Sequence, residues 1–212
     1  MPGQHARKQA LLELLRQRRI DNYSDWYRAA PSPLRTLHSM LWDPDHLTCW
    51  RAIEAFGVLT PLMRESNHES LVTLIRKLFW SMNDESGMLC RRAPETIAEI
   101  LLHAPSMRHD FLPNLTHYVL EEPFEAGICR ALAPLTESTA LAESDREAIT
   151  RAFPDLTRLI DVDSPEIRGW AAVALTRLGQ AVAIDRIAGI TLVSYSFDAG
   201  ELTEVAVEEL IG

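Results

Sequence analysis

The chain has 212 residues, of which 47% are hydrophobic and 24% are charged, a balance typical of soluble globular proteins. This leaves room for one or two domains with a substantial apolar core, so disorder is not the expected state. The formal net charge is −9, and because residues 1–19 are basic, the remainder of the chain is strongly acidic. An acidic body repels phosphate backbones, which argues against nucleic acid as the main partner and favours a cationic partner or simple solubility.

Three cysteines, Cys49, Cys90 and Cys129, lie far apart in the sequence and form no CxxC motif. This odd number and spacing indicate neither a disulfide scaffold nor a zinc module, so we expect the cysteines to be small, buried, apolar residues.

The N-terminus lacks the apolar core and cleavage site of a signal peptide, and no run approaches the roughly 18 apolar residues of a transmembrane helix. We therefore expect a cytoplasmic protein with no membrane span.

Residues 1–33 are predicted to form N-terminal capping helices. Apolar residues recur at helical spacing over residues 5–19, with basic residues on the other side, which indicates a helix that caps a larger array. A basic arm for a membrane or a nucleic acid is the alternative. A second short helix is predicted over residues 21–30, with Trp26 and Tyr27 packing inward, and Pro31-Ser32-Pro33 ends it.

From Leu34 onward, predicted helices come in pairs that repeat about every 40 residues. The first members are Leu34–Trp42, Leu71–Trp80, Phe111–Leu120 and Phe153–Ile160, and the second members begin near Leu47, Met88, Gly127 and Ile167. One pair cannot bury its own apolar face, so stacked neighbours must form a continuous core over residues 34–180. The fold class predicted from this period is all-α, a right-handed α-solenoid of about four helix pairs.

Short acidic turns separate the members of each pair, as in Asp43-Pro44-Asp45 and Asp161-Val162-Asp163-Ser164-Pro165. A hard-metal site is one interpretation, but successive turns are too far apart for several carboxylates to converge on one cation. We therefore predict that these turns cap the following helices, because Asp and Ser side chains accept hydrogen bonds from free backbone N–H groups there.

The stretch Asp163-Ser164-Pro165-Glu166-Ile167-Arg168, followed by Trp170–Leu175 and Leu178-Gly179, resembles the HEAT repeat. It is closest to the bacterial form called the phycobilisome-lyase HEAT-like repeat, and Phe79–Leu101 is similar to stretches of uncharacterised bacterial HEAT-like proteins. The resemblance implies an armadillo-like solenoid over roughly residues 34–180. It leaves two functions open, a protein-binding scaffold and a lyase-like or cofactor-handling enzyme, because one scaffold hosts many activities.

After Gly179 the pattern changes, and residues 181–212 are predicted to form a C-terminal helix and a β-hairpin cap. A helix is predicted over residues 181–188. The β-branched stretch 189–196 and residues 201–207 flank the turn Phe197-Asp198-Ala199-Gly200, which is typical of a hairpin, and a helical turn is expected at Glu208–Leu210. A dimer contact through the free edge of the hairpin is the alternative to a capping role.

Aligning the second helices places Trp50, Arg92, Arg130 and Trp170 at equivalent positions. Second helices commonly line the concave face of a solenoid, and Arg and Trp are enriched in binding hot spots. The alternative is that the tryptophans belong to the core while arginines pair with neighbouring acidic turns. Three such pairs would resemble the Asp–Arg ladder of HEAT repeats: Asp45 with Arg51, Glu85 with Arg91, and Asp163 with Arg168.

The stretch Phe79–Leu101 adds a long polar turn, Asn83–Gly87, and an ionisable stripe on the helix behind it. Glu95, Glu99 and His103 recur every four residues, so they share one helix face, which is either a groove site or a solvated face. The full set of predicted binding residues is Trp50, Asp84, Glu85, Arg92, Glu95, Glu99, His103, Arg130 and Trp170.

No catalytic, metal-binding or cofactor-binding residues are predicted. The sequence contains no HExxH, GxSxG, P-loop or GxGxxG motif, and His68-Glu69 is an isolated pair at an expected helix start. The pattern therefore favours a non-catalytic scaffold that holds a protein or peptide on a concave face.

Overall fold

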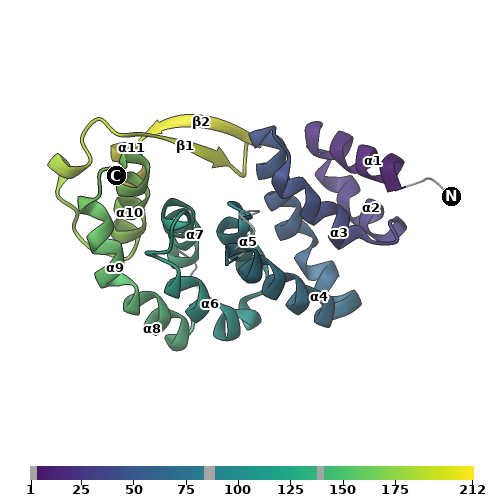
Figure 1. The fold of residues 1–212 in the computed structure, drawn as a ribbon, viewed down its shortest axis with the longest axis horizontal. Coiled ribbons are helices and arrows are strands. Elements are labelled where there is room, and N and C mark those ends of the chain that lie inside the picture. The colour runs from purple at the N-terminus through teal and green to yellow at the C-terminus, as the bar shows by residue number, and fades with distance from the viewer. Residues whose placement is uncertain (1–3, 84–88, 138–140) are drawn as a thin grey trace. The chain divides into compact units, whose positions relative to one another are not determined.

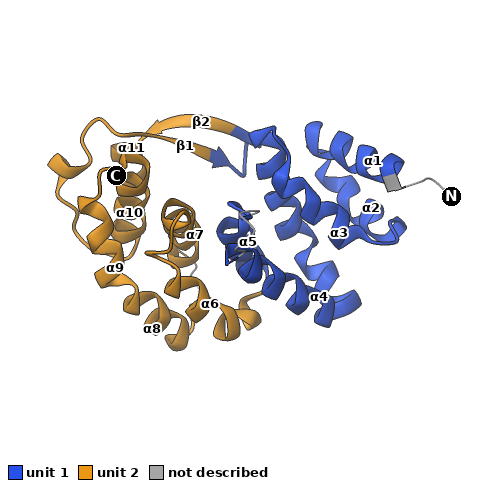
Figure 2. Ribbon diagram, in the orientation of Figure 1, with its two compact units in different colours: residues 1–103, 195–201 blue, residues 104–194, 202–212 orange. Residues whose placement is uncertain are grey.

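The computed structural model describes residues 4–83, 89–137 and 141–212, and most of these residues are helical (Figure 1). The chain divides into two compact units, which are described separately (Figure 2). Unit 1 contains residues 1–103 and 195–201, and unit 2 contains residues 104–194 and 202–212. The division predicted from the repeats, into residues 1–33, 34–180 and 181–212, stays a prediction.

Unit 1 is built around one long helical element, α4, on which the other helices pack. Its helices are α1 (Gln4–Arg16), α2 (Tyr23–Ala29), α3 (Pro33–His38), α4 (His46–Met82) and α5 (Ala93–His103). A 3₁₀ turn, Ser39–Trp42, continues α3. Tyr23 and Phe56 are fully buried in this unit, whereas Tyr27 is only half-buried, so the predicted inward packing of Tyr27 is incomplete.

Asn67 divides α4 into two helical segments, residues 46–66 and 68–82. Its backbone is extended, with φ −163° and ψ 81°, and its side-chain oxygen accepts a hydrogen bond from the Ser70 N–H at 3.0 Å. Asn67 is therefore the N-cap of the second segment. The two segments correspond to the helices predicted to begin near Leu47 and Leu71, and His68-Glu69 lies at the predicted helix start.

The capping role predicted for the acidic turns is confirmed at two of them. The Asp45 carboxylate accepts hydrogen bonds from the Leu47 N–H at 3.3 Å and the Thr48 N–H at 3.2 Å. A further hydrogen bond from the Thr48 hydroxyl holds the pKa of Asp45 below its usual value. Ser164 caps α10 by accepting a hydrogen bond from the Ile167 N–H at 3.4 Å. The long turn that contains Asp84 and Glu85 lies outside the described residues.

Unit 2 contains the remaining helices and most of the hairpin. Its elements are α6 (Arg108–His117), α7 (Glu125–Glu137), α8 (Glu143–Arg151), α9 (Phe153–Arg158), α10 (Pro165–Arg177), β1 (Thr191–Ser196), β2 (Glu201–Ala206) and α11 (Val207–Ile211). The end of β1 and the start of β2 belong to unit 1. Helices α7 and α10 pack closely on each other, and α6 packs on α8. The sequence pattern did not predict α8, whose buried apolar side chains are only Ala148 and Ile149.

The predicted hairpin and the helical turn after it are confirmed, but the helix predicted over residues 181–188 is wrong. This segment contains only a 3₁₀ turn, Ile184–Arg186. Gly179 and Gly189 bracket it with φ values of 75° and 73°, a left-handed conformation that interrupts a helix. Ile184 is 56% exposed, so the segment also lacks an apolar stripe that would hold a helix against the core.

The cysteines are buried free thiols, as predicted. Burial raises the pKa of Cys90 to about 12, so this side chain stays an uncharged thiol.

Among the described residues, no helix combines the length and apolar character needed to cross a membrane.

We predict that Asp45→Ala lowers the free energy of unfolding by about 1 kcal/mol, because the N-cap of α4 is lost. Asp45→Asn retains an accepting oxygen and should lose much less. Urea unfolding of the full chain followed by circular dichroism measures both. Equal losses in the two variants would show that charge, rather than capping, supports this helix end.

Candidate functional site

Trp50, Arg92 and Glu95 come together between α4 and α5 in unit 1. The Arg92 guanidinium lies 5.0 Å from the centre of the Trp50 ring, and its Nη1 is 3.1 Å from Glu95 Oε1. Trp50 is 5% exposed and Glu95 is 4% exposed. A cation stacked on an aromatic face and paired with a buried carboxylate is already satisfied within the protein. The structure thus brings three predicted binding residues into one internal cluster.

The predicted stripe Glu95–Glu99–His103 is largely buried. Glu99 is buried, and its Oε1 lies 3.1 Å from His103 Nε2, while the His103 side chain is 42% exposed. Gly57 of α4 lies against this pair, since a Cβ at that position would approach Glu99 Cγ and His103 Cδ2 to 2.8 Å. The stripe is therefore an interface between α4 and α5, with only His103 reaching solvent.

Glu54, which no sequence pattern singled out, is a buried carboxylate with several hydrogen-bond donors in unit 1. It is 4% exposed and accepts hydrogen bonds from Arg18 Nη2 at 2.6 Å and from the Tyr195 hydroxyl at 3.0 Å. Tyr195 in turn stacks on Trp50, with ring centres 5.5 Å apart. Burial, followed by the charge of Glu54, raises the pKa of Tyr195, so its hydroxyl remains a donor. The sequence contains one signal that could have identified Glu54: Arg51 and Glu54 have the same spacing as Arg92 and Glu95.

Arg18 adopts an unusual backbone conformation to reach Glu54. Its φ is 50°, and the hydrogen bonds from Arg19 N–H to the Leu14 carbonyl and from Arg18 N–H to the Leu15 carbonyl close α1 in a Schellman motif. Glycine is the usual residue at this position because L side chains are strained there. The Arg18 guanidinium also donates to the carbonyls of Phe197 and Asp198, so this one side chain holds the turn of the hairpin in unit 1.

The predicted Asp–Arg ladder is wrong at both rungs that the structure describes. Arg51 donates to the backbone carbonyls of Leu15 and Gly200 instead of pairing with Asp45, whose carboxylate caps α4. Arg168 donates to the carbonyls of Val162 and Asp163, each at 2.9 Å. The third rung, from Glu85 to Arg91, involves a residue outside the described ranges.

Arg130 and Trp170 form a second cluster, in unit 2. The Arg130 guanidinium lies 4.7 Å from the centre of the Trp170 ring, and its Nη2 is 2.9 Å from Glu166 Oε1. Trp170 is 5% exposed. The arrangement uses the same three residue types as the cluster of Trp50, Arg92 and Glu95, so each unit holds one predicted Arg–Trp pair in its interior.

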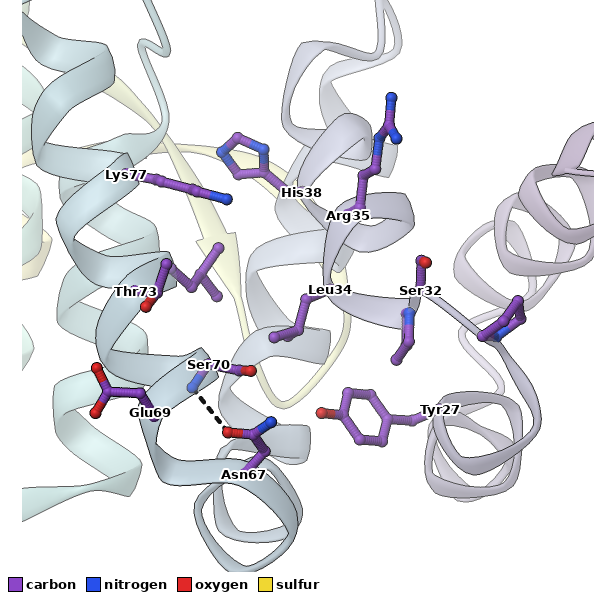
Figure 3. Close-up of a pocket in the computed structure, with 13 residues that line it drawn as sticks. Tyr27, Ser32, Leu34, Arg35, His38, Asn67, Glu69, Ser70, Thr73 and Lys77 are labelled. Atoms are coloured by element: carbon purple, nitrogen blue, oxygen red, sulfur yellow. Dashed lines mark hydrogen bonds between the residues drawn. The ribbon is translucent and has the colours of Figure 1, made fainter.

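An open groove of about 850 Å³ lies in unit 1 between α2, α3 and the second segment of α4 (Figure 3). We call it the α3–α4 groove. Its lining residues are Tyr27, Pro31, Ser32, Pro33, Leu34, Arg35, His38, Asn67, Glu69, Ser70, Thr73, Leu74 and Lys77. This volume falls within the range of about 300–1,000 Å³ typical of ligand sites. Sequence reasoning missed the groove because it sought a site on the second members of the helix pairs, whereas the groove is lined by residues 27–38 and 67–77.

Nitrogen-bearing side chains, two of them cationic, gather at one end of the α3–α4 groove. Figure 3 shows Arg35, His38 and Lys77 at this end, with Tyr27 and Asn67 at the other. Burial, followed by the charge of Lys77, lowers the pKa of His38, so its ring is neutral near pH 7. The His38 Nε2 atom is buried and has no hydrogen-bond partner among the described residues. The groove therefore offers polar groups that the fold itself does not use.

Within the described ranges, no group of three or more His, Cys, Asp or Glu side chains is arranged to hold a metal ion. The groove combines hydroxyl, imidazole, ammonium and guanidinium groups with apolar contacts from Leu34 and Leu74. These groups can bind a ligand through hydrogen bonds, charge and apolar contact.

Comparisons with known proteins give one distant relative. No family model matches the chain, and no solved structure matches it. An uncharacterised protein of Archaeoglobus fulgidus is 28% identical over 189 residues, which cover 85% of this chain and 93% of the relative. Since 189 residues exceed the length of either unit, the similarity extends over parts of both.

We predict that Arg18→Ala lowers the free energy of unfolding by about 3 kcal/mol or more, because Glu54 stays buried without its cation. Arg18→Gly removes the same ion pair but also relieves the left-handed strain, so it should be about 1 kcal/mol less damaging than the alanine variant. Urea unfolding of both variants measures the difference. An alanine variant as stable as the glycine variant would contradict the strain argument.

A second prediction concerns the pH dependence of the Glu99–His103 pair. The hydrogen bond to Glu99 raises the pKa of His103, so the pair stabilises the fold below the unfolded pKa of about 6.5 and stops doing so as pH rises through the folded value. Wild type should therefore exceed His103→Gln in stability at pH 5.5 and match it at pH 8.5. Melting curves at the two pH values test this, and a pH-independent difference would contradict it.

Proposed function

We propose that this protein is a non-catalytic binding protein, built as a HEAT-like solenoid, that holds a peptide segment of a partner protein in the α3–α4 groove. The paired helices of about 40-residue spacing support the solenoid interpretation, as does the division of α4 at Asn67 into members of successive pairs. The observation that carries the binding function is the groove itself, which is open and lined from α2, α3 and α4.

The α3–α4 groove is a better binding site than the predicted concave-face residues. Trp50, Glu95 and Trp170 are each at most 5% exposed, and the two arginines beside them stack and pair internally. A partner could reach them only by breaking those contacts. In the groove, by contrast, Arg35, Thr73 and Lys77 are exposed.

Two exposed tryptophans extend the surface beyond the charged end of the groove. Trp42 is 40% exposed and Trp80 is 69% exposed. Trp42 lies one turn beyond His38, with ring centres 4.8 Å apart, and Trp80 follows Lys77 by three residues on α4. Tryptophan beside basic side chains is the composition of protein-binding hot spots, which supports a peptide or protein as the occupant.

We predict that Thr73→Trp, which places a bulky neutral side chain in the groove, abolishes capture of the partner. The matched control is Thr150→Trp, the same change on the exposed face of α8. The tagged full chain and both variants would be used for affinity capture from lysate of the source organism, with partners identified by mass spectrometry and then titrated as purified proteins.

A partner that binds wild type and Thr150→Trp, but not Thr73→Trp, supports the proposal. Retention of every partner by Thr73→Trp contradicts it. Circular dichroism and melting temperature must agree among the three proteins, so that lost binding is not lost folding.

A further inference from the structure

The α3–α4 groove has a positive lining, although the whole chain has a net charge of −9. Its lining contains two cations, Arg35 and Lys77, and one carboxylate, Glu69. No hydrogen bond or ion pair of the Arg35 guanidinium or the Lys77 ammonium to another described residue is found. The half-buried arginines of unit 1, by comparison, donate to the protein's own oxygens, as Arg18, Arg51 and Arg92 do.

A second hollow continues this positive lining toward α1. It has a volume of about 490 Å³ and is lined by His5, Lys8, Arg35, Thr36 and Ser39. Arg35 lines both hollows, so Lys8, Arg35 and Lys77 form a basic track over α1, α3 and α4. Cations presented side by side without internal partners attract an anionic ligand.

The shape of this track favours an extended chain over a small anion. The two hollows meet at Arg35, and the tryptophans Trp42 and Trp80 lie one turn beyond the groove. Leu34 and Leu74 supply apolar contact along the groove. A ligand that matches all of these features has carboxylates for the track and apolar side chains for the groove.

We propose that the partner segment bound by the α3–α4 groove is an acidic peptide, whose carboxylates pair with Arg35 and Lys77 and whose apolar side chains contact Leu34, Leu74 and the exposed tryptophans. This inference rests on the proposed function and names the chemistry of its partner. Nucleic acid also carries anionic groups, but the acidic remainder of the chain repels a long phosphate backbone. A short acidic segment of a protein interacts mainly with the basic side chains of the groove.

The test uses a phage-displayed library of random 16-residue peptides, selected on the full chain. Arg35→Gln/Lys77→Gln removes the groove cations, and Arg146→Gln/Arg151→Gln makes the same charge change on the exposed surface of α8. Selected peptides are synthesised and titrated by fluorescence polarisation, each beside a copy in which Gln replaces every Glu and Asn replaces every Asp. A fluorescent 16-nucleotide single-stranded DNA is titrated in parallel.

We expect selected peptides to be rich in Asp and Glu. The Kd should rise about tenfold or more with Arg35→Gln/Lys77→Gln or with the neutral copy, because charge-assisted hydrogen bonds are lost. The α8 control should bind as wild type does. Added salt should weaken binding of the acidic peptides.

The possible failures separate the two proposals. Peptides that Thr73→Trp excludes, but that are neutral or basic or bind Arg35→Gln/Lys77→Gln equally well, contradict the acidic partner and leave the proposed function standing. A library that yields no binder contradicts both. DNA that binds more tightly than the peptides, and is lost in Arg35→Gln/Lys77→Gln, assigns the track to nucleic acid and overturns the acidic peptide.

Discussion

The burial of the Glu54 carboxylate is the constraint on which unit 1 depends. A carboxylate that leaves water must be compensated by charge and hydrogen bonds, and here Arg18 and Tyr195 supply both. These two residues belong to segments at opposite ends of the chain. Compensation of one charge therefore fixes the end of α1 and the turn of the hairpin against α4. It also explains a left-handed arginine where glycine would be less strained.

The same residue types serve the interior and the surface in this protein. Arginine and tryptophan meet in two buried clusters, Arg92 with Trp50 and Arg130 with Trp170, where stacking and ion pairs stabilise helix packing. Near the α3–α4 groove, Arg35 and Lys77 have no ion-pair partner in the part of the chain that the structure describes, and Trp80 is mostly exposed. Composition alone does not distinguish the two situations. Exposure and the presence of an internal partner do, and both support the proposal that the groove is the binding surface.

The net charge of the chain does not describe the charge of the α3–α4 groove. The acidic excess favours a cationic partner for surfaces outside the groove, which stays a prediction. The linings of the groove and of the adjoining hollow have the opposite balance, with Lys8, Arg35 and Lys77 against Glu69. Because an acidic body disfavours long polyanions, this balance supports the proposal that the groove binds short acidic segments.

Features that arise from neighbours along the chain could be predicted from the amino-acid sequence. Helical spacing placed most of the helices, Asp45 and Ser164 were recognisable caps, and alternation with a turn predicted β1 and β2, because these signals involve residues a few positions apart. The helix expected over residues 181–188 did not form, because Gly179 and Gly189 adopt left-handed conformations at its ends and Ile184 is exposed instead of packing on the core. Three facts could be read only from the folded structure: Glu54 pairs with Arg18 and Tyr195, Trp50 and Trp170 are buried, and Arg35 and Lys77 line a groove. Those facts depend on which distant segments pack together. That packing is set by the burial of apolar surface, which is non-directional and gives no short-range sequence pattern.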